Sequence, residues 1–248
     1  MPELITWAGR TLSGVDRFGK WVTTSLDGWW DSPEVKGDTE DRPYQDGEFD
    51  LPVYNQARLI TINGSLHVGN HSHLHEAMNF LTGPIAGRLQ VTGHGSVQWA
   101  DAKRNSGVKF TPVTDVFAQW QVRLKCVDPR KFGDTKTVAV ATGSPISVFH
   151  RGNYNATPSF VVKGSMPGGY TITVNGWNYA VTLPLVSGKP HTVDYNNGRL
   201  YVNGVLAQNS LGNTNTTPIP PGISVGVGLY PMTTGSGSAD MTITDTYI

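Results

Sequence analysis

Four of the seven histidines lie close together, at His67, His71, His73 and His75, and Glu76 follows them directly. Imidazole is the commonest metal-ligand side chain, and a His-x-His pair on a strand places both rings on one face. A carboxylate nearby would complete a set of ligands. The residue types therefore raise the hypothesis of a metal site, with His71, His73 and Glu76 as its candidate ligands.

The spacing around these residues approximates a cupin-like pattern, in which a Gly precedes a His-x-His and a Glu and a second Gly follow. Gly64, His71, His73, Glu76 and Gly83 occupy these places. However, the gap between His73 and Glu76 is shorter than in cupins, and Glu76 falls in a helical pattern. HSHLH also lacks the Asp of metallo-β-lactamase-like hydrolases. We therefore expect polar residues at a helix entry, either solvated or lining a subunit contact, with no metal and no cofactor.

Residues 73–82 have the spacing of an amphipathic helix. Leu74, Met78 and Leu81 recur at i, i+4 and i+7, which places them on one stripe. Ser72 is the expected N-cap, Glu76 is expected in the first turn, and the helix is expected to end before Gly83-Pro84. This is the one substantial helix that the sequence predicts.

The residues before this helix predict a long loop and then a strand. Residues 27–57 mix Gly, Pro and acidic residues without periodicity, so we expect a loop with one hairpin strand near Phe49 that orders against a partner. Residues 58–68 alternate between apolar and other side chains, as in a strand with one buried face, with a turn or bulge at Asn63-Gly64. A second long strand is expected over residues 117–127.

The pattern of apolar residues along the sequence changes after residue 150. Residues 151–158 have no apolar pattern, and beyond them short strand patterns recur at even spacing with turns between them. Asn196-Asn197-Gly198 and Asn203-Gly204 are expected hairpin turns. We predict two domains, 1–150 and 151–248, of which the first is β-rich with one α-helix and the second is a β-sandwich.

Composition and the absence of known motifs exclude several classes of partner and activity from our expectations. Nineteen basic and nineteen acidic residues cancel, so no overall field attracts nucleic acid or an anionic membrane. Cys126 is the single cysteine, which excludes an intramolecular disulfide. The sequence has no signal-peptide pattern and no apolar run of membrane-spanning length, so we expect no membrane anchor. Neither a nucleophile elbow nor a phosphate-binding glycine loop is present, and we expect no catalytic residue and no enzyme activity.

Aromatic residues supply two further hypotheses. Six of the seven tryptophans precede residue 121, and Trp29, Trp30, Tyr44 and Phe49 are candidates for a subunit interface because such contacts are rich in aromatic residues. The alternative is that these rings fill the domain's own core. In the second domain, Trp177 and Tyr179 are candidates for a sugar-stacking platform.

The order of these features resembles the distal tail proteins of long-tailed siphophages, a family that includes minor tail proteins of actinobacterial phages. In the first half the resemblance rests on GWWDSPEVKGDTEDRPYQDGEFD, RLITINGSL, one helix, GRLQV and FAQWQVRLKCVDPRKFG. In the second half it rests on NATPSFVVKG, YTITVNG, VDYNNGRLYVNG and IPPGISVGVG, which resemble the C-terminal domain of siphovirus tail components.

This resemblance implies a structural role in the virion. It implies a homohexameric, ring-forming N-terminal domain at the distal end of the tail, which contacts the tail tube protein on one side and the tail hub protein on the other and lets DNA pass. It also implies a galectin-like C-terminal β-sandwich that binds receptor-binding or other baseplate proteins. The protein would be synthesised in the cytoplasm of the host bacterium. The alternative is a carbohydrate-binding module that recognises host-surface glycans.

Overall fold

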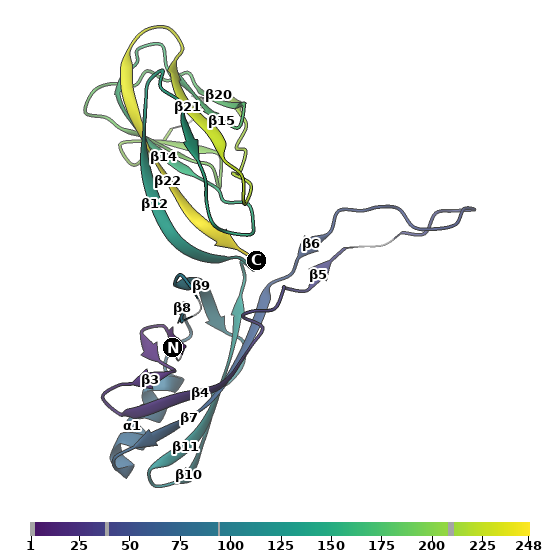
Figure 1. Cartoon of the computed structure of the whole chain (residues 1–248), viewed down its shortest axis with the longest axis vertical. Coiled ribbons are helices and arrows are strands. Elements are labelled where there is room, and N and C mark those ends of the chain that lie inside the picture. The colour runs from purple at the N-terminus through teal and green to yellow at the C-terminus, as the bar shows by residue number, and fades with distance from the viewer. Residues whose placement is uncertain (1–2, 38–39, 94, 208–210) are drawn as a thin grey trace. The chain divides into compact units, whose positions relative to one another are not determined.

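The computed structural model describes residues 3–37, 40–93, 95–207 and 211–248, and the chain divides into two compact units. The first unit is Met1–Lys131 together with Ile248, and the second is Phe132–Tyr247. The protein is mainly β, and α1 (His71–Thr82) is the one α-helix among the described residues (Figure 1). No helix in the described ranges is long and apolar enough to cross a membrane.

The first unit is built on a sheet that we call the central sheet, in which β10, β11, β7 and β4 lie side by side and antiparallel. The strands of this unit are β1 (Leu4–Trp7), β2 (Arg10–Thr11), β3 (Gly14–Val15), β4 (Gly19–Asp27), β5 (Val35–Lys36), β6 (Tyr54–Asn55), β7 (Arg58–Val68), β8 (Ala86–Thr92), β9 (Gln98–Arg104), β10 (Lys109–Thr114) and β11 (Phe117–Cys126).

Alternation along β7 gives the central sheet one buried and one open face, as the sequence predicts for residues 58–68. Ile60, Ile62 and Leu66 point into a core that α1 also enters. Gly64 lies on the same side of β7, and this position is a glycine because the Trp120 ring occupies the space that a Cβ would need. Trp120 packs edge-on against Trp21 at 5.9 Å between ring centroids, so two tryptophans fill the space above the glycine.

The expected turn or bulge at Asn63-Gly64 is wrong for β7, which continues through both residues. The irregularity lies in the neighbouring strand instead, where the register of β4 shifts between Thr23 and Ser25. The extra residue in β4 is Thr24, and it lies beside Gly64 of β7. At Gly64 the Trp120 ring fills the space of the missing side chain.

Helix α1 ends where the sequence predicts but begins earlier. Asn70 is the N-cap, and its side chain accepts the backbone N–H of His73. The predictions of Ser72 as the N-cap and of Glu76 in the first turn are therefore wrong. Asn and Ser are similarly good caps, so composition alone does not choose between two such residues placed close together. Leu74, Ala77 and Leu81 are the buried residues of the helix.

A second layer of strands completes the first unit. β1 pairs with β2 and β8, β8 pairs with β9, and the end of β9 pairs with β11 through Lys103↔Lys125 and Arg104↔Leu124. The central sheet therefore carries an apolar core, a helix and a second set of strands on one side.

The boundary between the units lies between Lys131 and Phe132, nineteen residues before the division that the sequence predicts at 150/151. Residues 132–150 belong with the second unit because β12 (Lys131–Ala141) lies beside β22 (Ser236–Tyr247) and β13 (Ile146–Val148) pairs with β21 (Val225–Pro231). Both partners are near the C-terminus, which a pass along the sequence does not reveal.

The second unit is a β-sandwich of two sheets, in the orders β19-β18-β17-β14-β22-β12 and β13-β21-β15-β16-β20. Both sheets contribute to one core, which includes Phe160, Tyr179, Val193 and Val227. Its remaining strands are β14 (Ser159–Ser165), β15 (Tyr170–Val174), β16 (Trp177–Val181), β17 (His191–Asp194), β18 (Arg199–Val202), β19 (Val205–Leu206) and β20 (Leu211–Thr214).

Both Asn-Gly turns predicted for the second unit are confirmed. Gly198 lies in the β17–β18 hairpin with φ +66°, and Asn203 and Gly204 link β18 to β19 with φ +47° and +83°. Two successive positive φ values are the geometry of a type I′ turn, which asparagine and glycine tolerate best.

Candidate functional site

Two buried cations, Arg58 and Lys131, hold the backbone at the end of β4, and we call this pair the clamp. Nη1 of Arg58 donates to the carbonyls of Gly28 (2.8 Å), Trp29 (3.3 Å) and Asp31, and its Nε donates to Pro129 (3.0 Å). One side chain thus joins the chain after β4 to the chain after β11.

Lys131 completes the clamp from the other side. Its Nζ donates to the carbonyl of Trp29 at 2.9 Å and lies 5.5 Å and 5.6 Å from the ring centroids of Trp29 and Trp30. Both cations are almost fully buried. A buried cation is tolerated where several acceptors surround it, and here most acceptors are backbone carbonyls.

Burial sets the protonation chemistry of the clamp. It lowers the pKa of Arg58, with opposing contributions from Cys126 and Asp31. The pKa of Lys131 is lowered to about 8, mainly by burial and also by the neighbouring Arg58 charge, while Asp31 acts in the opposite direction. Lys131 therefore loses its charge more readily than an exposed lysine.

Beyond the clamp the chain extends as a hairpin, described over residues 31–37 and 40–57, which we call the arm (Figure 1). β5 and β6 pair within it, Asp41 bridges to Glu48, and the N–H of Phe49 donates to the carbonyl of Glu40 at 2.9 Å. Nearly every described arm residue is exposed. The sequence predicts a loop here with a strand near Phe49, whereas the structure has a two-stranded hairpin whose second strand is at Tyr54–Asn55.

The four interface candidates divide between core and surface. Trp29 is wholly buried in the first unit's core, so as an interface residue this prediction is wrong. Trp30 and Phe49 are about half exposed, at 48% and 47%, and Tyr44 near the arm's turn is fully exposed. These three remain candidates because their rings offer apolar area that the monomer does not use.

The central sheet has two free edges. β3 covers β4 only at Trp21 and Lys20, and β10 pairs only with β11; no other strand within the described residues pairs along either outer side. A free edge presents unpaired N–H and C=O groups to another chain. Pro112, which has no N–H, limits what can pair with β10.

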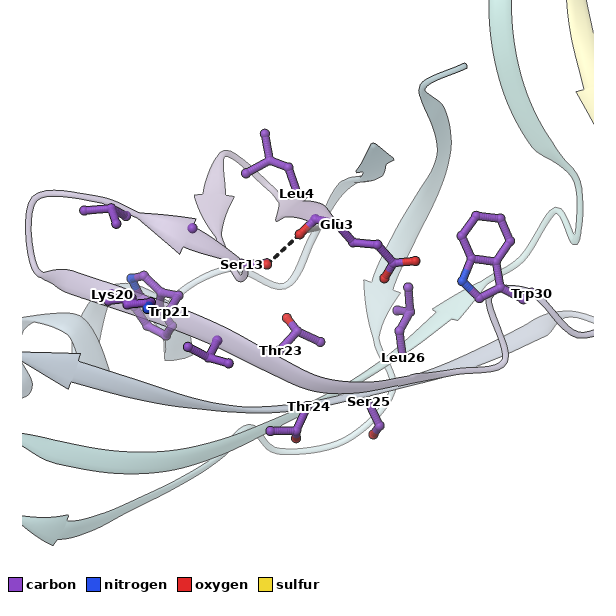
Figure 2. A pocket seen from close by; sticks show the side chains of 13 residues that line it. Glu3, Leu4, Ser13, Lys20, Trp21, Thr23, Thr24, Ser25, Leu26 and Trp30 are labelled. Atoms are coloured by element: carbon purple, nitrogen blue, oxygen red, sulfur yellow. Dashed lines mark hydrogen bonds between the residues drawn. The ribbon is translucent and has the colours of Figure 1, made fainter. Parts of the chain in front are cut away.

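A groove of about 770 Å³ runs along the free side of β4 (Figure 2). Its lining runs from Lys20 to Leu26 and includes Leu4, Val15 and Trp30 on its rim. Leu4, Val15 and Trp30 are all exposed. The edge of β4 therefore combines free backbone groups with an apolar rim, as an interface requires.

The open face of the central sheet is polar. Gln121 donates to Asn63 at 2.8 Å, Asn63 donates to Ser25 at 2.8 Å, and Ser25 donates to Asp27 at 3.1 Å. This row crosses three strands and satisfies its own hydrogen bonds, so it is a wettable surface rather than an uncovered core.

The histidines do not converge on a metal site. Within the described residues, no three His, Cys, Asp or Glu side chains are placed to hold a metal ion. His71 and His75 lie one helical turn apart with ring centroids 6.3 Å from each other, and His71 contacts Asp115 at 3.8 Å. His73 and Glu76, the other candidates, lie on the same helix, so the strand geometry of a cupin is absent here.

The two sugar-stacking candidates are not equivalent. Trp177 is 55% exposed, whereas Tyr179 is fully buried and donates its hydroxyl to the carbonyl of Gly198 at 3.0 Å. Burial raises the pKa of Tyr179 to about 12. The prediction of Tyr179 as a stacking residue is therefore wrong, and of the two candidates it is Trp177 that offers an exposed ring to a ligand.

Comparison with known proteins identifies the fold. No sequence profile of a known family and no curated protein matches the chain. Among solved structures, the chain is similar to the SPP1 Dit protein, described as a paradigm of the hub adsorption apparatus in phages that infect Gram-positive bacteria, with a TM-score of 0.78 and 15% identity over 100% of both chains. The chain has the fold of SPP1 Dit. It is also similar to a chain of the phage P2 baseplate in its activated conformation with Ca, with a TM-score of 0.55, 6% identity and coverage of 99% and 98%.

Sequence reasoning missed the clamp. A signal for Arg58 was present, because this residue is in phase with Ile60 and Ile62 on the apolar side of an alternating strand. A cation at such a position needs buried acceptors. Lys131 lies in the turn after β11 and carries no comparable pattern, since its acceptor, the carbonyl of Trp29, is distant in sequence.

Arg58→Met should release the base of the arm. Loss of the guanidinium leaves the carbonyls of Gly28, Trp29 and Asp31 without their donor, which should cost on the order of 3 kcal/mol of unfolding free energy. Urea unfolding measures this cost, and limited proteolysis should cut the arm faster. The exposed Arg88→Met is the matched control. Equal stability of the two variants would contradict the role of Arg58.

Lys131 should make stability depend on pH in the alkaline range. Its folded pKa, about 8, lies below the ordinary lysine pKa of 10.5, so the unfolded chain binds more protons between these pH values. The unfolding free energy of the wild type should therefore rise relative to that of Lys131→Met from pH about 8 to about 10.5. Parallel pH curves for the two proteins would show that the lysine is not perturbed.

Proposed function

We propose that the protein is a structural component of a phage tail tip or baseplate. In this proposal it forms a homohexameric ring that joins the tail tube protein to the tail hub and the host-recognition proteins, at the distal end of the tail, and lets DNA pass. The similarity of the whole chain to SPP1 Dit supports this role. The galectin-like character of the second unit and its binding of baseplate proteins are part of the same proposal.

The observation that carries the ring is the pair of free edges on one sheet. Strands alternate in direction across the central sheet, so β10 runs opposite to β4. β10 of one copy can therefore continue the antiparallel sheet beside β4 of the next. Because the two surfaces differ, the contact is heterologous, and it repeats from copy to copy; in this proposal the rotation between copies closes the series into a ring.

The faces of the sheet suggest how it is oriented in such a ring. One face carries the core, α1 and the strands around β8, while the other is open and polar. The bulkier layer needs the larger circumference, so it lies outside, and the row of Gln121, Asn63 and Ser25 lines the channel. A hydrogen-bonded polar wall suits a passage, since it offers no apolar surface to what moves through it.

A carbohydrate-binding role for the second unit is the second candidate. Trp177 supports it, because this exposed ring follows directly on the Asn175-Gly176 turn between β15 and β16. A single indole gives a sugar one stacking face, so the carbohydrate-binding role has less support than the hexameric assembly.

Cysteines placed on the two edges test the ring directly. Thr111→Cys on β10, combined in turn with a cysteine at Val22, Thr24 or Ser25 of β4, should give under oxidation a disulfide ladder up to the covalent hexamer. Burial raises the pKa of the native Cys126 to about 11, so this thiol stays protonated at neutral pH and does not interfere.

The single-cysteine variants are the control, since a heterologous contact does not bring two copies of one edge together. They should yield no species above a dimer. Failure of all three pairs to cross-link in the purified protein would refute the edge-to-edge ring.

A further inference from the structure

Charge is segregated along this neutral chain. The arm, residues 31–57, contains eight of the nineteen acidic and two of the nineteen basic residues, so its net charge is −6 and the remainder carries +6. An uneven distribution of charge creates a local field even where the total charge is zero. The question is where the positive excess lies in the fold.

The open face of the central sheet holds much of this excess. Its exposed charged side chains are Lys20, Lys109, Arg123, Lys125 and Asp27, and Lys103 of β9 joins them because it stands directly opposite Lys125. Within the described residues none of the five cations forms a salt bridge. Thr61 stands between Asp27 and Arg123, so this carboxylate lies about 10 Å, two strand spacings, from that cation. Five cations against one carboxylate give the face a net charge of +4.

Four of these cations form what we call the basic cluster, which consists of Lys103, Lys109, Arg123 and Lys125. Arg123 and Lys125 alternate along β11, and Lys103 stands directly opposite Lys125. Lys109 stands opposite Gln121 in the next row. Like charges directly opposite on paired strands destabilise a sheet, so an anion bound here would stabilise it.

Neutral polar side chains continue the basic cluster across the sheet. Lys109, Gln121 and Asn63 are neighbours in one row. A hollow of about 470 Å³ at this row has a lining that includes Thr24, Ser65, Thr111 and Gln119. Lys, Arg, Asn, Gln, Ser and Thr are side chains that contact the phosphate and sugar of nucleic acids. The open face thus brings the chemistry of phosphate recognition together on one surface.

The spacing of the cations suits a phosphodiester chain. Side chains on one face of a strand recur about every 6.7 Å, and neighbouring strands lie about 4.8 Å apart. Each strand of B-DNA carries one phosphate per ~3.4 Å of helix axis. Arg123 and Lys125 therefore span about two phosphate steps. Lys103 and Lys109 widen the contact on the side of β11 away from β7.

The absence of apolar anchors in the middle of the open face favours a phosphate chain over a protein segment. Protein partners gain most of their binding energy from a few buried, mostly aromatic or apolar, side chains. The row of Gln121 and the row of Arg123 contain no large apolar side chain. Leu59 lies beyond them at one end of the sheet, and Phe117 lies at the other end against His67, with ring centroids 4.6 Å apart.

We propose that the open face binds duplex DNA through phosphate contacts of the basic cluster. This inference rests on the proposed ring, in which the open face lines the channel, and adds that the wall holds the DNA by its phosphates at the end from which the arm leaves. Phosphate contacts carry no base information, so binding should be independent of DNA sequence. Because such contacts release counterions, binding should weaken steeply as salt rises.

Fluorescence anisotropy of a short labelled DNA duplex tests this binding in the full-length protein. Arg123→Gln with Lys125→Gln removes two cations and should weaken binding at least about tenfold at ~50 mM salt. Between ~50 and ~200 mM salt, its plot of log affinity against log salt should be shallower by about 2 for each copy in contact. Arg123→Lys with Lys125→Arg keeps both charges and should bind within about twofold of the wild type.

Lys189→Gln with Arg199→Gln, two exposed positions in the second unit, is the matched control and should bind the duplex like the wild type. Circular dichroism and thermal unfolding of each variant separate lost binding from lost folding. Light scattering of the same samples reports assembly. A cluster variant that binds the duplex as tightly as the wild type would overturn the proposal.

The remaining outcomes separate the DNA binding from the ring. A wild type that assembles but does not bind the duplex overturns the DNA binding and leaves the ring intact. Single chains that bind the duplex, with the expected loss in the cluster variant, but never assemble refute the ring and support the DNA binding. Binding of polyglutamate without binding of the duplex would show that the face serves an acidic protein segment, and the proposal would be overturned.

Discussion

The fold of the first unit depends on the buried cation Arg58, which binds the backbone where the chain leaves β4 and enters the arm. Arg58 binds the carbonyls of residues 28, 29 and 31 just where β4 ends and the arm begins, and Lys131 binds the carbonyl of Trp29 from the opposite side. Those carbonyls leave the sheet ladder there and would otherwise be buried without donors. The clamp therefore lets a well-ordered sheet end in an exposed hairpin without fraying the core.

The central sheet uses its remaining surfaces in three ways. One face is apolar and is covered within the unit, the other is polar and satisfies its own hydrogen bonds, and both outer edges are free over most of their length. Free edges on a monomer favour association, and an edge proline with a bulged partner edge restricts it to a matching surface. The first unit therefore has two sheet edges that can pair with another chain, and the whole chain has the fold of SPP1 Dit.

Local sequence patterns predicted many of the strands, turns and the helix, but they failed where a residue's position depends on contacts with residues distant in sequence. The alternation of residues 58–68, the apolar stripe of α1 and the two Asn-Gly turns of the second unit each depend on neighbours in sequence, and the structure confirms them. The division at residue 132 depends on strands near the C-terminus. Trp29 and Trp30 are neighbouring residues of the same type, yet Trp29 is buried in the core and Trp30 is exposed at the surface. Trp177 and Tyr179 share one side of β16, but the core ends before Trp177, and only the facing sheet determines where it ends.

Light scattering of the purified wild-type protein, with negative-stain images of the same sample over a range of concentrations, tests the central claim most directly. The account predicts a mass of six chains and ring-shaped particles with an open centre, and the assembly should persist on dilution because two contacts per copy hold it together. A monomer at every concentration, or an open filament of indefinite length, would contradict it.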